Sequence, residues 1–155
     1  MNTGKKWSLC FLILSVAALL FVCVLTIVID PYFHYHVPLR GLQYPIELER
    51  YQNDGILKHF SYDAIITGSS MTENFKSSEC DTLFGVNSVK TSLSGSSLKE
   101  VNNQLQRAIH ANSSIKLVIR GLDGWNLLDD KDHMCVGDEL PDFLYDDNPL
   151  NDVEY

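Results

Sequence analysis

The apolar positions of the chain fall into one long uninterrupted run and several short ones. Residues 7–29 contain no charged side chain and are apolar at nearly every position. At about 1.5 Å per residue, a helix of this length crosses a hydrocarbon core of about 30 Å. No polar stripe divides the run, whereas a helix buried in a soluble protein would show one. The pattern therefore predicts a transmembrane helix over residues 7–29.

Charged residues flank this run and set its direction. Lys5 and Lys6 precede it, and Asp30 ends it. The positive-inside rule then places residues 1–6 in the cytoplasm and the C-terminal part of the chain outside the cell membrane. A cleavable signal peptide is the alternative, with a shorter apolar core that ends at small residues. The small residues Ser15, Ala17 and Ala18 lie in the middle of the run instead, which favours an uncleaved single-pass anchor.

Residues 30–60 are expected to form a juxtamembrane connection. Two prolines and alternating aromatic side chains in residues 31–38 argue against regular helix there. His34 and His36 would point to one side of an extended segment, but further metal ligands are missing nearby. We interpret them as part of an interfacial aromatic segment. The pair Asp54-Gly55 indicates a turn.

From residue 61 the pattern becomes regular. Short β-branched apolar runs alternate with amphipathic stretches of helical spacing. An order of strand, helix, strand, helix, strand with short connections predicts a parallel sheet in an α/β fold. The expected strands are 64–66, 88–93 and 115–119, and the expected helices are 71–83 and 98–111.

Each predicted strand ends in a turn rich in Gly, Ser or Asp, at residues 68–70, 94–96 and 121–123. The carboxyl ends of parallel strands meet at one edge of a sheet, where ligands bind. A serine that opens a helix at such an edge lies beside N–H groups that can hold an oxyanion. Ser70-x-x-Glu73 also matches a capping box, which would explain the serine without any chemistry; Ser97-x-x-Glu100 repeats the pattern.

The three turns also carry a family resemblance. Gly68-Ser69-Ser70, Gly95 and Gly121-Leu122-Asp123 resemble three motif blocks of the SGNH (GDSL-like) hydrolases, with Ser in place of Asp in the first block. With its N-terminal anchor, the chain is similar to the membrane-anchored proteins of teichoic-acid D-alanylation. The resemblance covers residues 62–123 and implies a partial three-layer, flavodoxin-like SGNH domain.

The resemblance implies roles for individual residues. Ser70 would be the nucleophile, and the backbone N–H groups of Ser70 and Gly95 would form the oxyanion hole. Asp123 stands where the family has an asparagine, and its carboxylate accepts hydrogen bonds where the asparagine donates them. The last block, Asp-x-x-His, supplies the base; only Asp130 and His133 have its spacing, and they follow the third strand too closely. We therefore expect the chain to be inactive alone and to be the front part of a longer protein.

Composition narrows the function classes. The chain has 12 Lys and Arg against 20 Asp and Glu, a net charge of −8, so it lacks the basic surface of a nucleic-acid-binding protein. Half of the acidic residues fall in residues 129–155. The spacing of the four cysteines predicts no metal site, and we expect no cofactor. Cys80 and Cys135 could pair in an oxidising compartment or remain free thiols.

The sequence thus predicts a single-pass, membrane-anchored SGNH-like protein of the cell envelope, related to serine esterases and acyltransferases that act on envelope polymers. Its expected partners are the lipid bilayer and an envelope polymer or another envelope protein. The alternatives are a non-catalytic envelope binding protein that uses the same edge of the sheet, and a truncated gene product. The expected segments are a cytoplasmic N-terminus (1–6), a transmembrane helix (7–29), a connection (30–60), a partial SGNH-like α/β domain (61–128) and an acidic C-terminal segment (129–155).

Overall fold

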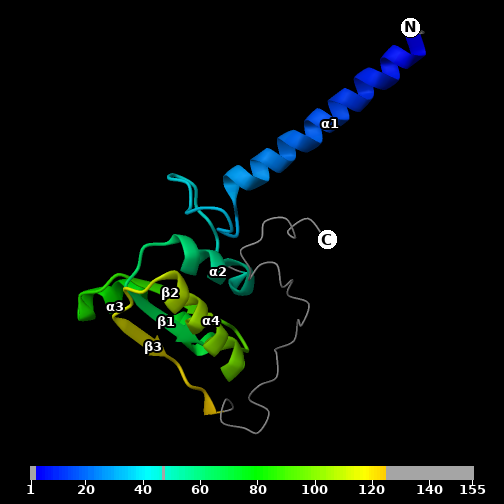
Figure 1. Ribbon diagram of the computed structural model, residues 1–155. Coiled ribbons are helices and arrows are strands. Elements are labelled where there is room, and N and C mark those ends of the chain that lie inside the picture. The colour runs from blue at the N-terminus through cyan, green and yellow to red at the C-terminus, as the bar shows by residue number, and fades with distance from the viewer. Residues whose placement is uncertain (1–2, 47, 125–155) are drawn as a thin grey trace.

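The computed structural model describes residues 3–46 and 48–124 as a long apolar helix followed by an α/β domain (Figure 1). Helix α1 (Thr3–Ile29) projects away from the domain and contains the predicted span. Within the described residues it is the one helix long and apolar enough to cross a membrane, and its apolar window, within Gly4–Ile29, is not buried against the protein. A signal sequence near the N-terminus would have the same properties, so the helix is an anchor or a signal helix.

The domain is built on a three-stranded parallel sheet with the order β2-β1-β3. The central strand β1 (Ala64–Gly68) pairs with β2 (Ser88–Ser92) on one side and β3 (Leu117–Arg120) on the other. Ala64 stands opposite Ser88 and Leu117, so the three strands end at nearly the same level. The predicted parallel α/β fold is confirmed.

Helices cover both faces of this sheet. Helices α2 (Glu49–His59) and α4 (Leu98–Ala111) pack against each other, as Figure 1 shows. A short 3-10 helix, η1 (Ser70–Asn74), leads into α3 (Ser77–Phe84), which packs against β2. Because the chain runs from β1 to β2 and then back across β1 to β3, right-handed crossovers put α3 and α4 on opposite faces. The result is three layers.

The polar stretch 71–83, predicted as one helix, instead contains η1, a break and most of α3. Lys90 Nζ lies 2.6 Å from the carbonyl oxygen of Glu73 and 3.3 Å from that of Phe75. A continuous α-helix would use these oxygens for its own N–H groups four residues further on. The lysine from β2 therefore satisfies the carbonyl groups at the break.

Helix α2 was not expected within residues 30–60, where Asp54-Gly55 suggested a turn. Gly55 lies buried inside α2, and a Cβ on it would overlap the backbone carbonyl of Phe33. Asp54 is also buried, with its carboxylate 3.3 Å from Nε of Arg107 on α4. Both residues therefore serve the close packing of a helix, and the predicted turn is wrong.

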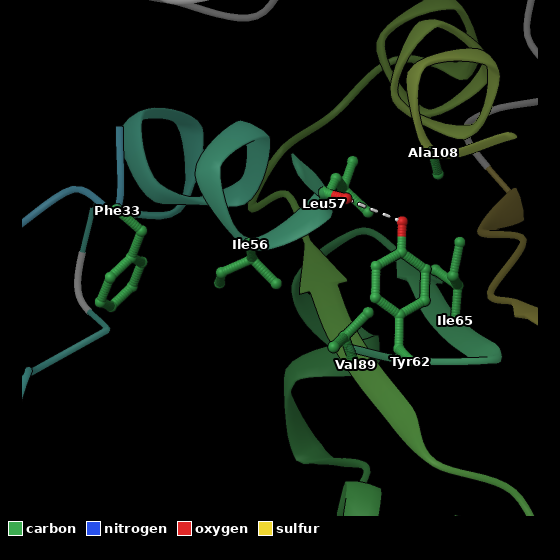
Figure 2. Packing of buried hydrophobic residues seen from close by; sticks show 7 residues of the cluster. All are labelled: Phe33, Ile56, Leu57, Tyr62, Ile65, Val89 and Ala108. Carbon is green, nitrogen blue, oxygen red and sulfur yellow. Dashed lines mark hydrogen bonds between the residues drawn. The ribbon is translucent and has the colours of Figure 1, made fainter. Parts of the chain in front are cut away.

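The hydrophobic core lies mainly between α2, α4 and the sheet. In Figure 2, Tyr62 reaches toward Leu57, and its hydroxyl donates a hydrogen bond of 3.0 Å to the Leu57 carbonyl. Burial raises the pKa of Tyr62 to about 12. Phe33 joins this core although it follows the long helix by only a few residues. The buried cluster consists of Phe33, Ile56, Leu57, Tyr62, Ile65, Val89 and Ala108.

The chain turns sharply where α1 ends. Asp30 is buried, has a φ of 44°, and accepts hydrogen bonds from the backbone N–H groups of His34, Tyr35 and His36 at 2.8, 2.8 and 2.9 Å. This turn directs Phe33 into the core. The segment after α1 is therefore part of the folded domain, and Gln52 of α2 donates a hydrogen bond of 3.0 Å to the carbonyl of Pro31.

Several predictions concern residues outside the described part of the chain. Asp130, His133 and Cys135 belong there, as does the acidic segment 129–155. Cys80 is buried in α3, and its pairing with Cys135, which lies outside the described residues, stays a prediction.

Candidate functional site

The turns after the three strands meet at one edge of the sheet, as expected. The carbonyl of Gly68 accepts from the N–H of Leu93 at 2.8 Å, and the carbonyl of Thr67 accepts from the N–H of Gly121 at 2.8 Å. Both neighbouring turns are thus bonded directly to the end of β1. The strand order reverses here, and such a crevice between the first and third strands is where open α/β sheets bind ligands. We call this edge the rim, defined as residues 68–70, 94–96 and 121–123.

Close backbone packing shapes the first turn. Gly68 has a φ of 148°, which side-chain-bearing residues rarely adopt. A Cβ on Gly68 would lie 2.8 Å from Cγ2 of Thr72 and 3.1 Å from Cα of Gly121. Thr72 is itself held by a bond of 2.7 Å between its hydroxyl and that of Ser92. The turn after β1 therefore needs glycine at residue 68.

Ser69 is bonded to the third turn. Its side chain is buried, and its hydroxyl donates a hydrogen bond to the carboxylate of Asp123, 54 residues further along the chain. The same Oγ lies 3.4 Å from the backbone nitrogen of Met71, so Ser69 is the N-cap of η1. The capping box predicted for Ser70 and Glu73 is therefore a wrong prediction at this turn, because the preceding serine provides the cap.

Ser70 is the exposed residue of the first turn and the first residue of η1. The sequence argument placed it at the start of a single helix over residues 71–83. The short 3-10 helix η1 has a smaller dipole than a long helix. An anion at Ser70 would therefore be stabilised mainly by hydrogen bonds from nearby backbone N–H groups. Ser70 follows Ser69 in the first turn of the rim, and its predicted role as nucleophile stays a prediction.

The second turn is held by the start of α2. Gly95, with a φ of 66°, follows Ser94, whose N–H donates to Oε2 of Glu49 at 2.8 Å. Arg50 Nη2 donates to the carbonyl of Ser94 at 2.9 Å, and its Nε lies 3.3 Å from Oε1 of Glu100. Sequence reasoning missed Glu49 and Arg50 because it did not predict the helix that carries them.

The capping box predicted at the start of α4 is confirmed. The N–H of Ser97 donates to Oε2 of Glu100 at 2.9 Å, and the N–H of Glu100 donates to Oγ of Ser97 at 3.2 Å. Both residues are buried. These two reciprocal hydrogen bonds fix the first residue of α4, directly after the second turn.

A cleft of about 400 Å³ opens beside the rim between α2, η1, α3 and the β2 edge. Glu49 and Glu73 bring two carboxylates to it. Burial raises the pKa of Glu49, the hydrogen bond and negative charge of Glu73 raise it further, and the Ser94 N–H opposes the shift. The volume falls in the range of small-ligand sites. Its apolar wall is formed by Ile46, Ile56, Phe60 and Val89.

No histidine lies among the rim residues 68–70, 94–96 and 121–123. The described histidines lie in the segment after α1, at the end of α2 and in the last turn of α4; they are His34, His36, His59 and His110. Among residues 3–46 and 48–124, no group of three or more His, Cys, Asp or Glu could hold a metal ion. The Asp130 and His133 pair cannot be placed, because it lies outside the described residues.

No protein-family model, curated protein or solved structure matches this chain. The SGNH resemblance therefore rests on the rim residues alone. What the structure establishes is an N-terminal long apolar helix followed by a small α/β domain with three parallel strands.

Proposed function

We propose that the chain is a membrane-anchored SGNH-like protein of the cell envelope, and that its rim contributes the nucleophile turn of a serine esterase or acyltransferase acting on envelope polymers. One observation carries this proposal. Ser70 is exposed at the carboxyl end of β1, while Ser69 provides the helix cap. Helix capping therefore explains the serine at residue 69 and does not explain the serine at residue 70.

In the proposed reaction, Oγ of Ser70 attacks the carbonyl carbon of an ester and transfers its proton to a general base. The tetrahedral oxyanion is held by the backbone N–H groups that the resemblance assigns to Ser70 and Gly95. The alcohol then leaves with the proton. Water or a polymer hydroxyl attacks the acyl-serine and regenerates Ser70. The base is an Asp-x-x-His pair that the described residues do not supply.

Asp123 takes a positioning role in this proposal. Its carboxylate accepts the hydroxyl proton of Ser69 and so ties the third turn to the first. A carboxylate bonded in this way cannot replace the asparagine donor of the family. The first two turns therefore have to provide the oxyanion contacts.

We further propose that α1 stays attached as an anchor, with the N-terminus in the cytoplasm. Signal peptidases need small residues near the end of the apolar run. The sequence has neither Ala nor Ser between Cys23 and Ser61. The buried carboxylate of Asp30 also organises the chain directly after the helix. Both observations favour an uncleaved helix.

Fluorophosphonate labelling of the native protein in its own membranes tests the catalytic role, because the proposed base lies outside the described residues. We expect the wild type to be labelled and Ser70→Ala to lose the label completely. Ser94→Ala is the matched control, an exposed serine of the same rim, and should keep the label. Labelling that survives in Ser70→Ala would overturn the proposal.

A non-catalytic envelope binding protein is the second candidate, favoured by the carboxylate of Asp123 at the position of a family donor. It predicts that the folded native protein carries no label on Ser70. It also predicts that the protein binds an envelope polymer through the rim, so that exchanging the exposed rim residue Ser70 for a bulky Trp weakens binding. Ser70-dependent labelling would decide against this candidate.

A further inference from the structure

The loop that follows the Asp30 turn exposes four large apolar side chains within eight residues. We call residues 35–42 the collar. Clusters of exposed apolar side chains mark interaction surfaces on soluble domains. The exposed apolar side chains of the collar are Tyr35 (44%), Val37 (49%), Leu39 (38%) and Leu42 (52%).

The collar is bonded to the last turn of α1. Nε2 of His36 lies 3.1 Å from the carbonyl oxygen of Ile27, and the hydroxyl of Tyr44 donates to the carbonyl of Ile29 at 2.7 Å. The N–H of Leu39 in turn lies 3.4 Å from the Tyr44 hydroxyl. Figure 1 shows this cyan loop beside the domain end of α1. The collar therefore contacts the helix within about one turn, or about 5.4 Å, of its end.

The length of α1 fixes the depth of the collar in a bilayer. The apolar helix Gly4–Ile29 has 26 residues and is about 39 Å long, against a hydrocarbon core of about 30 Å. The headgroup region adds about 5 to 8 Å on each side. A helix of this length ends in that region, and a loop bonded to its last turn lies there too.

We propose that the collar is a lipid-contact surface that inserts Val37, Leu39 and Leu42 between the headgroups and acyl chains of the outer leaflet. The occupant is a phospholipid bilayer, because the collar is bonded to the last turn of α1, where the apolar side chains of Val28 and Ile29 are themselves exposed. Tyr35 suits the membrane interface, and the exposed Arg40 can bond lipid phosphate. This inference depends on α1 being an anchor and is independent of any chemistry at Ser70.

Fluorescence quenching by lipids brominated near the headgroup end of their acyl chains tests the collar. The full chain, with Trp7→Phe and Trp125→Phe, carries a single Trp at Leu42 and is reconstituted into brominated phosphatidylcholine vesicles. We expect Leu42→Trp to lose about half of its emission and to shift to the blue, since interfacial side chains sit about 5 to 10 Å into the bilayer. The matched control is Leu83→Trp, on the exposed face of α3 (77%), which should be unquenched.

The outcomes separate the collar from the anchor. A chain with Trp7 as its only Trp reports on α1 itself, because Trp7 lies in its first turns. If Trp7 is quenched and Leu42→Trp is not, the collar proposal is wrong and the anchor stands. If neither is quenched, the anchor fails and the collar with it. Leu39→Trp is a second collar probe, so misfolding of one variant does not decide the result. Equal quenching of Leu42→Trp and Leu83→Trp would also overturn the proposal.

Discussion

Two turns of this protein share the pattern Ser-x-x-Glu, and only one of them forms a capping box. At the start of α4, Ser97 and Glu100 bond each other, and Arg50 stabilises the glutamate. At the start of η1, Glu73 meets the carboxylate of Glu49, and the cap comes from the serine before the motif. The comparison indicates that a Ser-x-x-Glu sequence forms a capping box where a distant residue of opposite charge stabilises its glutamate, as Arg50 does for Glu100.

The two turns are consequently held by different forces. Side-chain hydrogen bonds fix the turn before α4. The turn before η1 depends on glycine packing and on the bond from Ser69 to Asp123. Its own motif serine, Ser70, is left exposed. The predictions below act on one turn or the other.

The largest effect is expected from Gly68→Ala, which breaks the packing of the first turn. The new Cβ meets Thr72 and Gly121 at a φ that disfavours side chains, so we expect a loss of about 3 kcal/mol in the free energy of unfolding. Urea unfolding of the full chain in lipid nanodiscs measures it. Gly85→Ala is the control: its φ is also positive, at 65°, but nothing lies within 4 Å, and the loss should be about 1 kcal/mol. Equal losses would show that packing at the rim does not matter.

Removing the two motif serines sharpens the comparison. Ser97→Ala loses a buried cap and should destabilise the protein by about 1 to 2 kcal/mol. Ser70→Ala should change the free energy of unfolding by less than about 0.5 kcal/mol, as an exposed substitution without a cap. Thermal unfolding of both variants in the same nanodiscs compares them. A cost for Ser70→Ala as large as that for Ser97→Ala would mean that Ser70 caps the turn after all.

A smaller effect than that of Ser97→Ala is expected from the carboxylate pair at the first turn, Glu49 and Glu73. The pKa of Glu49 is raised above its ordinary value of 4.5, so the stability that protonated Glu49 contributes is complete below that value and is lost as the pH rises through the raised value. Glu73→Gln removes the neighbouring charge and should reduce this loss by about 0.5 kcal/mol, a figure that allows for solvent screening.

Urea unfolding at a series of pH values from 4 upward, in steps across that window, measures the pair. Glu79→Gln is the control, because the exposed side chain of Glu79 on α3 pairs with Lys76 instead. The expected result is a flatter pH dependence in Glu73→Gln alone. Parallel curves for the wild type and Glu73→Gln would show that the two carboxylates do not interact.

Local patterns were enough to predict the sheet and α4. The three strands follow from short β-branched runs, and α4 follows from helical spacing behind a capping box whose members lie three residues apart. These signals are contained within a few neighbouring residues. The edge where the turns meet follows from the parallel topology and needs no side-chain detail.

The features that sequence reasoning missed depend on distant partners. In the sequence, Gly55 indicates a turn. In the structure, the glycine is needed because the backbone carbonyl of Phe33 packs against it, and the sequence does not show this contact. The bond from Ser69 to Asp123 joins residues 54 positions apart, and nothing in either segment shows which of two adjacent serines faces the carboxylate. The family resemblance assigned the nucleophile to Ser70, whereas the contact with Asp123 determines that Ser69 is the N-cap.

Phe33 limits how the domain can be separated from its helix. Its side chain is 1% exposed and packs on Phe60 with ring centroids 5.3 Å apart, although it stands just past the end of α1. A soluble version trimmed beyond residue 33 would start with a cavity in its core, a defect that costs about 3 to 5 kcal/mol for a lost aromatic side chain. A trimmed protein intended for crystallisation should therefore begin no later than Asp30. A protease that sheds the domain by cutting beyond Phe33 would release a weakened protein.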